Sequence, residues 1–227
     1  MKKSIAAAPI EPPLFPDGEP MLIAPIPTFA DGGHYADLRW ANETVPGGAD
    51  DVMVERVVTG GVVWRDLALP NMQLMDCRIG ADDFAGAQRH KPYLRRVVIA
   101  GARMIGATLT DGDLRDVVFD GANLTLARIW GCALASVRFS RCALRDASFE
   151  RSDLRGVRFE RCDLSGADLR GAKLKGADLR GCAIDGLRIE LRDLVGAIID
   201  EQQALSLVQQ LGIIIRPLDL ERDDAAR

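Results

Sequence analysis

One stretch of the sequence decides the fold, and it reads Asp163-Leu164-Ser165-Gly166-Ala167-Asp168-Leu169-Arg170-Gly171-Ala172-Lys173-Leu174-Lys175-Gly176-Ala177-Asp178-Leu179-Arg180-Gly181. A leucine recurs at every fifth residue, with a small residue two positions before it and a glycine two positions after it. This period matches neither the 3.6-residue period of a helix nor the two-residue period of a flat strand. It is the period of a chain that turns a corner in every unit.

The same register extends far beyond this stretch. Every fifth residue from Leu94 to Ile199 is leucine, isoleucine, phenylalanine or methionine, which gives 22 consecutive positions without a polar residue. Four corners complete one square turn of 20 residues, and successive turns stack at the roughly 4.8 Å spacing of neighbouring strands. The large residues that we expect to form the core include Leu94, Ile99, Leu114, Phe119, Leu124, Phe139, Phe149, Phe159, Leu164, Leu169, Leu174 and Leu179.

This pattern resembles the pentapeptide-repeat family, whose motif is A(D/N)LxG. Residues 167–171 and 177–181 both read Ala-Asp-Leu-Arg-Gly and match the motif in full. The resemblance covers residues 94–199, and the register continues backwards through Phe84 to Trp64 and Val54. It implies an all-β solenoid, a right-handed quadrilateral parallel β-helix with a short C-terminal α-helical cap.

A square turn predicts that residues 20 apart lie directly above one another. Phe119, Phe139 and Phe159 have this spacing, so we expect an aromatic stack inside one face. The same spacing in the small-residue positions relates Cys142, Cys162 and Cys182. We interpret these cysteines as small core residues rather than as a metal or redox site.

The chain divides into three segments. Residues 1–50 hold seven of the eleven prolines within their first 27 positions, which disfavours helices and central strands. We expect either an extended arm along the solenoid or a short irregular cap there, and the arm is a candidate for binding a partner. Residues 51–199 form the solenoid, and residues 200–227 form a C-terminal capping segment.

The C-terminal segment begins with a helix signal. Asp200 and Gln203 have the spacing of a capping box, and Gly212 is a helix terminator. A short strand over residues 213–215 and an acidic tail are expected to follow. The helix either caps the last coil or forms a homodimer seam, since several members of the family dimerise through such a tail. The residues expected at this cap or seam are Leu205, Val208, Leu211, Ile213 and Ile215.

The register is interrupted once, at Arg89, where a large apolar residue belongs. We expect residues 85–93 to project as a loop from a corner of the solenoid. Such a loop is either a tolerated insertion or a recognition element, because loops carry function on rigid scaffolds. Gyrase-protecting members of the family carry projecting loops of this general kind. The candidate partner-binding residues of the loop are Gln88, Arg89, His90, Lys91 and Tyr93.

The sequence carries no recognisable catalytic, cofactor-binding or metal-binding motif. His34 and His90 are its only histidines, and neither has a companion nucleophile at motif spacing. P-loop, dinucleotide, zinc-protease and paired-cysteine motifs are absent. The aspartates that precede the central leucines belong to the repeat, where they are expected to hydrogen-bond the turn backbone. We therefore expect a non-enzymatic protein without cofactor or metal.

Charge constrains the partner. Residues 94–199 carry 18 Lys or Arg against 14 Asp or Glu, a net of +4, and the rest of the chain carries 11 against 19, a net of −8. The family resemblance implies a second hypothesis, mimicry of B-form DNA toward type II topoisomerases such as DNA gyrase, but that mimicry requires an acidic face. Interspersed carboxylates also argue against direct nucleic-acid binding. The outward candidates for partner binding are Trp130, Arg138, Arg141, Arg158 and Arg161.

Two hypotheses follow from the sequence. The first is a protein-interaction scaffold with an unknown partner, and the second is a topoisomerase-binding regulator or antibiotic-resistance factor. The sequence holds no apolar stretch near the roughly 20 residues that a membrane-spanning helix needs, and its start does not resemble a signal peptide. We expect a cytoplasmic protein with no membrane contact.

Overall fold

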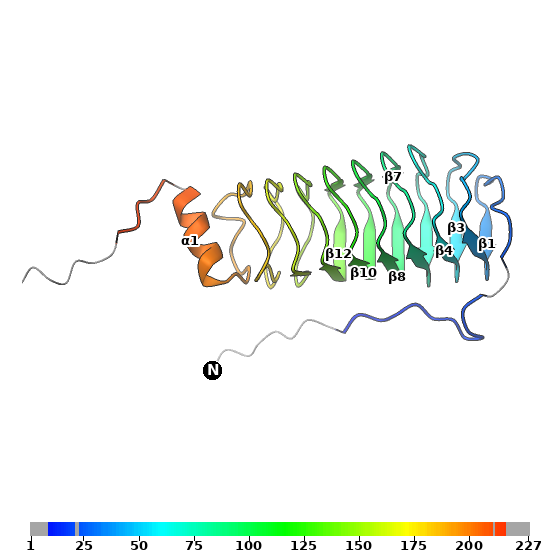
Figure 1. Cartoon of the computed structure of the whole chain (residues 1–227), viewed down its shortest axis with the longest axis horizontal. Coiled ribbons are helices and arrows are strands. Elements are labelled where there is room, and N and C mark those ends of the chain that lie inside the picture. The colour runs from blue at the N-terminus through cyan, green and yellow to red at the C-terminus, as the bar shows by residue number, and fades with distance from the viewer. Residues whose placement is uncertain (1–8, 21–22, 211, 217–227) are drawn as a thin grey trace, which may run out of the picture.

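The computed structural model describes residues 9–20, 23–210 and 212–216 of the chain. Stacked coils form a straight rod with one helix, α1 (Glu201–Gln210), at its end (Figure 1). The strands are β1 (His34–Ala36), β2 (Arg39–Ala41), β3 (Met53–Glu55), β4 (Val58–Gly60), β5 (Gln73–Met75), β6 (Arg78–Gly80), β7 (Gln88–His90), β8 (Tyr93–Ala100), β9 (Thr108–Thr110), β10 (Asp113–Asp120), β11 (Arg128–Trp130), β12 (Ala133–Ser140) and β13 (Arg158–Glu160).

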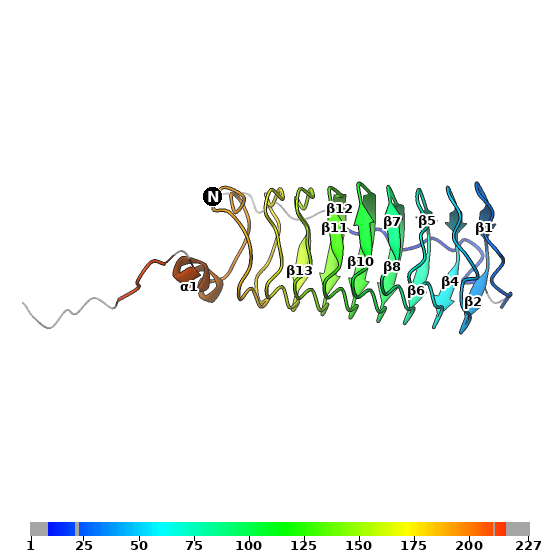
Figure 2. The same ribbon diagram turned by 90° about the horizontal axis from the view of Figure 1, so that it is seen from above.

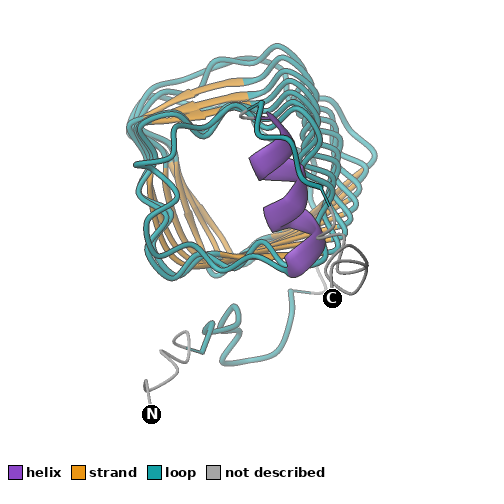
Figure 3. Ribbon diagram, turned by 90° about the vertical axis from the view of Figure 1, so that its left-hand side faces the viewer, coloured by secondary structure: helices purple, strands orange, loops and turns teal. Residues whose placement is uncertain are grey.

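Viewed along its axis, the rod has a square cross-section (Figure 3). We name the four faces after their central residues in one coil: face A at Leu114, face B at Phe119, face C at Leu124 and face D at Ile129. A ten-stranded sheet covers faces A and B, and β7, β9 and β11 form a three-stranded sheet on face D. Isolated parallel bridges such as Arg103↔Asn123 build face C. The fold is the predicted right-handed quadrilateral parallel β-helix.

The register between coils is 20 residues, as the sequence predicts. Leu114 pairs with Leu134, and Phe119 pairs with Phe139. The corners need a residue in the left-handed backbone region, which glycine adopts freely and other residues adopt at a cost. Nine of the 18 non-glycine residues with positive φ are aspartate or asparagine, the types that tolerate this conformation best.

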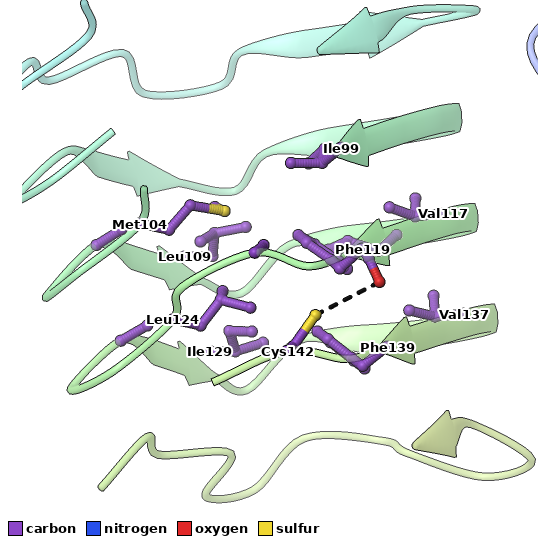
Figure 4. Packing of buried hydrophobic residues seen from close by; sticks show 14 of the residues in the cluster. Ile99, Met104, Leu109, Val117, Phe119, Leu124, Ile129, Val137, Phe139 and Cys142 are labelled. Atoms are coloured by element: carbon purple, nitrogen blue, oxygen red, sulfur yellow. Dashed lines mark hydrogen bonds between the residues drawn. The ribbon is translucent and has the colours of Figure 1, made fainter. Parts of the chain in front are cut away.

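The interior confirms the predicted columns of side chains. The Phe119 and Phe139 rings stack with centroids 4.7 Å apart (Figure 4). The Phe139 and Phe159 rings stack with centroids 5.1 Å apart. The predicted core residues are at most 4% exposed. Cys142 lies beside this stack, where its Sγ donates to the carbonyl oxygen of Phe119 at 3.4 Å. The cysteines of the column are buried thiols. The interaction with Cys142, and to a smaller extent burial, raises the pKa of the Cys162 thiol to about 12.

The first coil lies within the segment that we assigned to the arm or cap. Tyr35 pairs with Val54 and Trp40 with Thr59, so this coil is one residue shorter than the others. Phe29 packs on the Tyr35 ring at a centroid distance of 4.9 Å and covers the end of the solenoid. The solenoid therefore begins before residue 51, and only the residues ahead of this coil form an arm.

The helix α1 closes the opposite end of the solenoid. Gln203 N–H donates to Asp200 Oδ1 and Asp200 N–H donates to Gln203 Oε1, both at 3.0 Å, which is the predicted capping box. The Gln203 amide also donates to the carbonyl oxygens of Leu179 and Cys182, and Leu207 is buried. Gly212 has a φ of 76° and ends the helix. The helix thus satisfies carbonyl groups that the last coil leaves unpaired.

The details of this cap differ from the prediction. The buried side of the helix consists of Gln203 and Leu207, whereas Leu205 is 50% exposed and Val208 is half-buried. Residues 213–215 are exposed and form no strand, because no neighbouring strand edge pairs with them. Leu211 and the acidic tail lie outside the described residues.

The prediction of a loop at residues 85–93 is wrong. Gln88, Arg89 and His90 form β7, which pairs in register with β9, and Ala68 bridges Gln88 in the preceding coil. Arg89 points into the interior and occupies the large-residue position of face D. The coil stays closed because the long aliphatic stem of arginine fills the space of a leucine, while its guanidinium reaches main-chain carbonyl groups.

Candidate partner-binding groove

The N-terminal arm, residues 9–20, lies along the corner between faces A and B. Figures 1 and 2 show it running beside the rod, back from the first coil toward the middle. Asp76 and Asp116 occupy this corner, and their Oδ1 atoms accept the N–H groups of Leu14 at 2.8 Å and of Glu11 at 3.3 Å. The arm is therefore held through its main chain, in an extended conformation.

The corner residues that hold the arm are themselves fixed. Arg96 donates from Nε and Nη2 to the two carboxylate oxygens of Asp76, each at 2.6 Å. Farther along the arm, Glu19 forms ion pairs with Arg78 at 2.7 Å and with Arg39 at 3.4 Å. The bidentate contact orients Asp76 toward the arm, and the ion pairs of Glu19 attach the arm itself to the rod.

Beyond Pro9 the same corner continues as a groove with a volume of about 900 Å³. Its floor consists of Ser136, Gly156 and Gly176, which follow Asp76, Arg96 and Asp116 at 20-residue intervals. A Cβ atom added to Gly156 would meet no other atom within 4 Å, so the space above the floor is open. The groove is the part of the arm's track where the corner side chains become small.

Two columns of cations flank this floor. Arg138 and Arg158 lie one above the other on face B, and Arg155 and Lys175 do so on face A. Arg155 pairs with Asp153 at 2.6 Å. In the described part of the chain, no carboxylate lies within 4.0 Å of Arg138, Arg158 or Lys175. The carboxylates in the groove wall are Glu11 and Asp120, and Arg141 binds Asp120 at 2.5 Å.

The regular repeat explains why these cations are unusual. In the unit Asp-Leu-Arg, the arginine pairs with the aspartate two positions before it, as in Arg155 with Asp153 and Arg180 with Asp178. The hydrogen bonds from these guanidinium groups hold the pKa of Asp153 and of Asp178 below the ordinary value. Arg138 and Arg158 instead stand before the central residue, where the repeat places aspartate. Their charges are thus not neutralised within their own units.

The other predicted partner-binding residues do not gather at this groove. Gln88 and His90 are exposed on face D, Lys91 lies at a corner, Tyr93 is half-buried on face A, and Arg89 is internal. Trp130 is half-buried on face D, with the Arg151 guanidinium 5.6 Å from its ring centroid. Arg141 and Arg161 lie exposed at the corner between faces B and C.

The sequence analysis identified Arg138 and Arg158 as outward candidates for partner binding but missed the groove beside them. The missing signal was the corner position, where side chains shrink to Ser136, Gly156 and Gly176 along the axis. An alignment of the chain in blocks of 20 residues shows this trend directly. The arm's path carried no such signal, because it has no periodicity.

Two other kinds of feature are absent from the described residues, a metal-binding cluster and a membrane-spanning helix. In the ranges 9–20, 23–210 and 212–216, no three histidine, cysteine, aspartate or glutamate side chains lie close enough to hold a metal ion. The helix present in those same ranges is too short and too polar to span a bilayer.

These features define the class of protein: a β-solenoid with a closed apolar interior, whose polar and charged side chains lie mainly on its outer faces and corners. Residues 102–141 and 142–181 each match the family model described as pentapeptide repeats (8 copies), so this part of the chain is similar to that family. The chain matches no curated protein.

Several solved structures are similar to this chain. QnrB1, a plasmid-mediated fluoroquinolone resistance protein, shows 18% identity and a TM-score of 0.41 over 82% of this chain and 100% of its own. HetL of the cyanobacterium Nostoc sp. strain PCC 7120, a protein involved in heterocyst differentiation regulation, shows 22% identity and a TM-score of 0.40 over 75% and 91%. A pentapeptide-repeat protein of the Arabidopsis thaliana thylakoid lumen shows 23% identity and a TM-score of 0.39 over 41% and 65%.

Proposed function

We propose that this chain is a non-catalytic cytoplasmic scaffold, and that the corner groove between Arg138, Arg158, Arg155 and Lys175 binds an extended acidic segment of a protein partner. The observation that carries this proposal is the arm. It demonstrates that an extended segment lies along this corner, held by its main chain, and the open groove continues the same track.

The charge of the groove favours an acidic ligand. Arg138, Arg158 and Lys175 have no ion-pair partner among the described residues, so a carboxylate placed between the columns meets cations on both sides. The glycine floor allows the main chain of a ligand to approach closely. Such charge complementarity contributes specificity and a fast association rate.

A protein segment fits this groove better than nucleic acid does. Proteins that bind single strands combine a basic track with aromatic side chains on which bases stack. The groove is lined by no aromatic residue within the described ranges, and it includes the carboxylates of Glu11 and Asp120. Stacking is therefore not offered, and two negative charges oppose a phosphate backbone.

A topoisomerase is the narrower alternative, and it needs an acidic face that imitates DNA. Several carboxylates on the outer faces form ion pairs: Asp83 with Arg65 and Arg103, and Asp163 with Arg145. Among the described residues at the groove, the three unpaired cations Arg138, Arg158 and Lys175 outnumber the one unpaired carboxylate, Glu11. We therefore place this alternative second. We expect that adding this protein leaves the supercoiling rate of purified gyrase unchanged, both in the absence and in the presence of a quinolone. Inhibition of gyrase by the protein, or protection of gyrase from the quinolone, would make the topoisomerase hypothesis the first.

The binding proposal is tested with a fluorescein-labelled glutamate-rich peptide of about six residues, enough to span the groove in extended form. Fluorescence anisotropy with the wild type and with the triple variant Arg138→Ser, Arg158→Ser and Lys175→Ser measures Kd. Loss of three cations is expected to weaken binding at least about tenfold.

The matched control removes three cations elsewhere: Arg103→Ser, Arg128→Ser and Arg188→Ser, on faces C and D. It changes net charge equally and is expected to leave Kd within about twofold. Equal weakening by both variants would reduce the effect to bulk charge and reject the groove. Tighter binding of an oligothymidylate than of the peptide would instead assign the groove to nucleic acid.

A second copy of this chain is a further candidate partner at the capped end. Leu205 and residues 213–215 are exposed and apolar there, as a dimer seam requires. Light scattering of the wild type and of the variant Leu205→Ser with Ile214→Ser tests this. A dimer that becomes a monomer in the variant supports the seam, and a monomeric wild type rejects it.

A further inference from the structure

Arg89, the residue that breaks the sequence pattern, is buried in the interior with 8% of its surface exposed. Its Nη1 donates to the carbonyl oxygens of Leu67 at 2.7 Å and of Gln88 at 3.1 Å. Its Nη2 has no hydrogen-bond partner among the residues that the structure describes. One strong donor therefore points into the interior without an acceptor.

Arg89 remains a cation at neutral pH. Burial lowers its pKa to about 10, still well above neutrality, and no charged side chain contributes to the shift. A buried charge without a counter-charge is costly, and proteins ordinarily pair such a group. Within the described residues, nothing supplies the negative charge.

A cavity of about 40 Å³ adjoins this guanidinium. Its walls are otherwise apolar and include Leu94, Ile99, Met104 and Leu109. Figure 4 shows Ile99, Met104 and Leu109 projecting into the same interior. A single water needs roughly 10–15 Å³ on this scale, so the cavity accommodates a particle of one or a few atoms and excludes peptides and nucleotides.

We propose that the cavity beside Arg89 binds a small monovalent anion, with Nη2 of Arg89 as the hydrogen-bond donor. One negative charge neutralises one guanidinium, and the apolar walls offer nothing to stabilise a second charge. This excludes dianions such as sulfate. A halide fits best, because it accepts a hydrogen bond from any direction and its remaining surface can face apolar side chains. The site is independent of the groove and of any protein partner.

The test measures thermal unfolding of the full chain as sodium bromide replaces sodium fluoride at constant ionic strength of about 0.1 M, which holds screening fixed. Because a ligand that binds only the folded state stabilises it, Tm of the wild type is expected to rise by a few degrees and to saturate. The matched variant is Arg89→Leu, which places at this position the residue found one coil before and one coil after it, Leu69 and Leu109. Its Tm is expected not to respond.

A crystal grown with bromide gives a second, independent measurement. An anomalous peak within hydrogen-bond distance of Arg89 Nη2, together with a bromide response confined to the wild type, supports the site. Equal responses in both proteins, a water in place of the anomalous peak, or a peak that appears only in molar soaks without a solution response would each overturn it. The variant Arg89→Lys, which keeps the charge with fewer donors, is expected to retain a weakened response.

Discussion

The coils up to residue 100 and the coils of residues 102–181 build the same ladder from different residues. In the second region, leucine and phenylalanine fill the centre while alanine and cysteine fill the small positions, and the repeat motif is recognisable. In the first region, Trp40 and Trp64 fill the interior beside the buried polar residues Asp82 and Arg89. Both regions keep parallel pairing, as in Val54 with Leu74 and Leu114 with Leu134.

This difference shows which part of the sequence the fold requires. Main-chain hydrogen bonds link coil to coil, so they do not depend on side-chain identity. The side chains must fill a closed square, and a tryptophan or the stem of an arginine does so as well as a leucine. The motif is thus one solution for filling the square, whereas the length of 20 residues is kept in every described coil after the first.

The largest expected effect comes from breaking the coil length. Deletion of residues 86–92 removes the whole of β7 and shifts every later coil out of phase, so we expect loss of the cooperative unfolding transition. Deletion of residues 143–162 removes one whole coil and keeps the register, so it should fold with reduced stability. Calorimetry and circular dichroism distinguish the two. A folded, cooperative protein lacking residues 86–92 would restore the projecting-loop interpretation.

The next effect tests the regular region. Phe139 lies between two stacked rings and is fully buried, so Phe139→Ala is expected to cost about 3–5 kcal/mol of unfolding free energy. Replacing Phe84 by alanine in the less regular region should cost less, because Phe84 borders the cavity and is 9% exposed, whereas Phe139 is fully buried. Urea unfolding measures both variants. A greater loss at Phe84 would mean that the irregular coils are the better packed.

A smaller effect is expected at the arm. Burial favours a raised pKa for Asp76, but the hydrogen bonds from Arg96 and from Leu14 N–H outweigh it and hold that pKa below the ordinary value. The stability from this carboxylate is therefore present above the unfolded pKa of about 3.9 and is lost as pH falls through the lower folded pKa.

Asp76→Ala should release the arm at every pH, which limited proteolysis of residues 9–20 detects as faster cleavage. The substitution removes the acceptor for Leu14 N–H and for Arg96, so a loss of about 1–2 kcal/mol is expected. Asp37→Ala, which removes an exposed aspartate at an earlier corner, is the control and should leave the cleavage rate of the arm unchanged. Unchanged cleavage in Asp76→Ala would show that the arm is held elsewhere.

The smallest expected effect has the opposite dependence on pH. Burial raises the pKa of Asp82, although Val62 N–H and Trp64 Nε1 each donate to its carboxylate at 3.0 Å. A raised folded pKa means that stability falls as pH rises from about 3.9 to the folded pKa, and is constant above it. Asp82→Asn should abolish this fall. A stability difference between wild type and Asp82→Asn that does not change with pH would contradict the raised pKa.

The sequence was sufficient to predict the fold because five-residue periodicity reports directly on the corners and on the buried column. The stack of Phe119, Phe139 and Phe159 and the capping box at Asp200 followed from spacing alone. The loop prediction at Arg89 was wrong because a pattern of polar and apolar residues counts arginine as polar, although its aliphatic stem can fill an apolar position. The groove was missed because it combines three features: small corner residues, cations in neighbouring coils, and an arm whose described residues 9–12 line the same corner.

The Asp-Leu-Arg unit has a further consequence for the solenoid as a whole. Each such unit supplies both the acid and the base of its ion pair, so adding units lengthens the rod without adding net charge. Two such rods would therefore repel each other only weakly at a distance. The electrostatic field that extends as far as a Debye length, about 10 Å at 0.1 M salt, comes from the units that carry an unpaired charge. A diffusing partner would meet a surface of balanced charge with a positive stripe near Arg138 and Arg158. A few substitutions that leave a charge unpaired are therefore enough to determine where a charged partner binds.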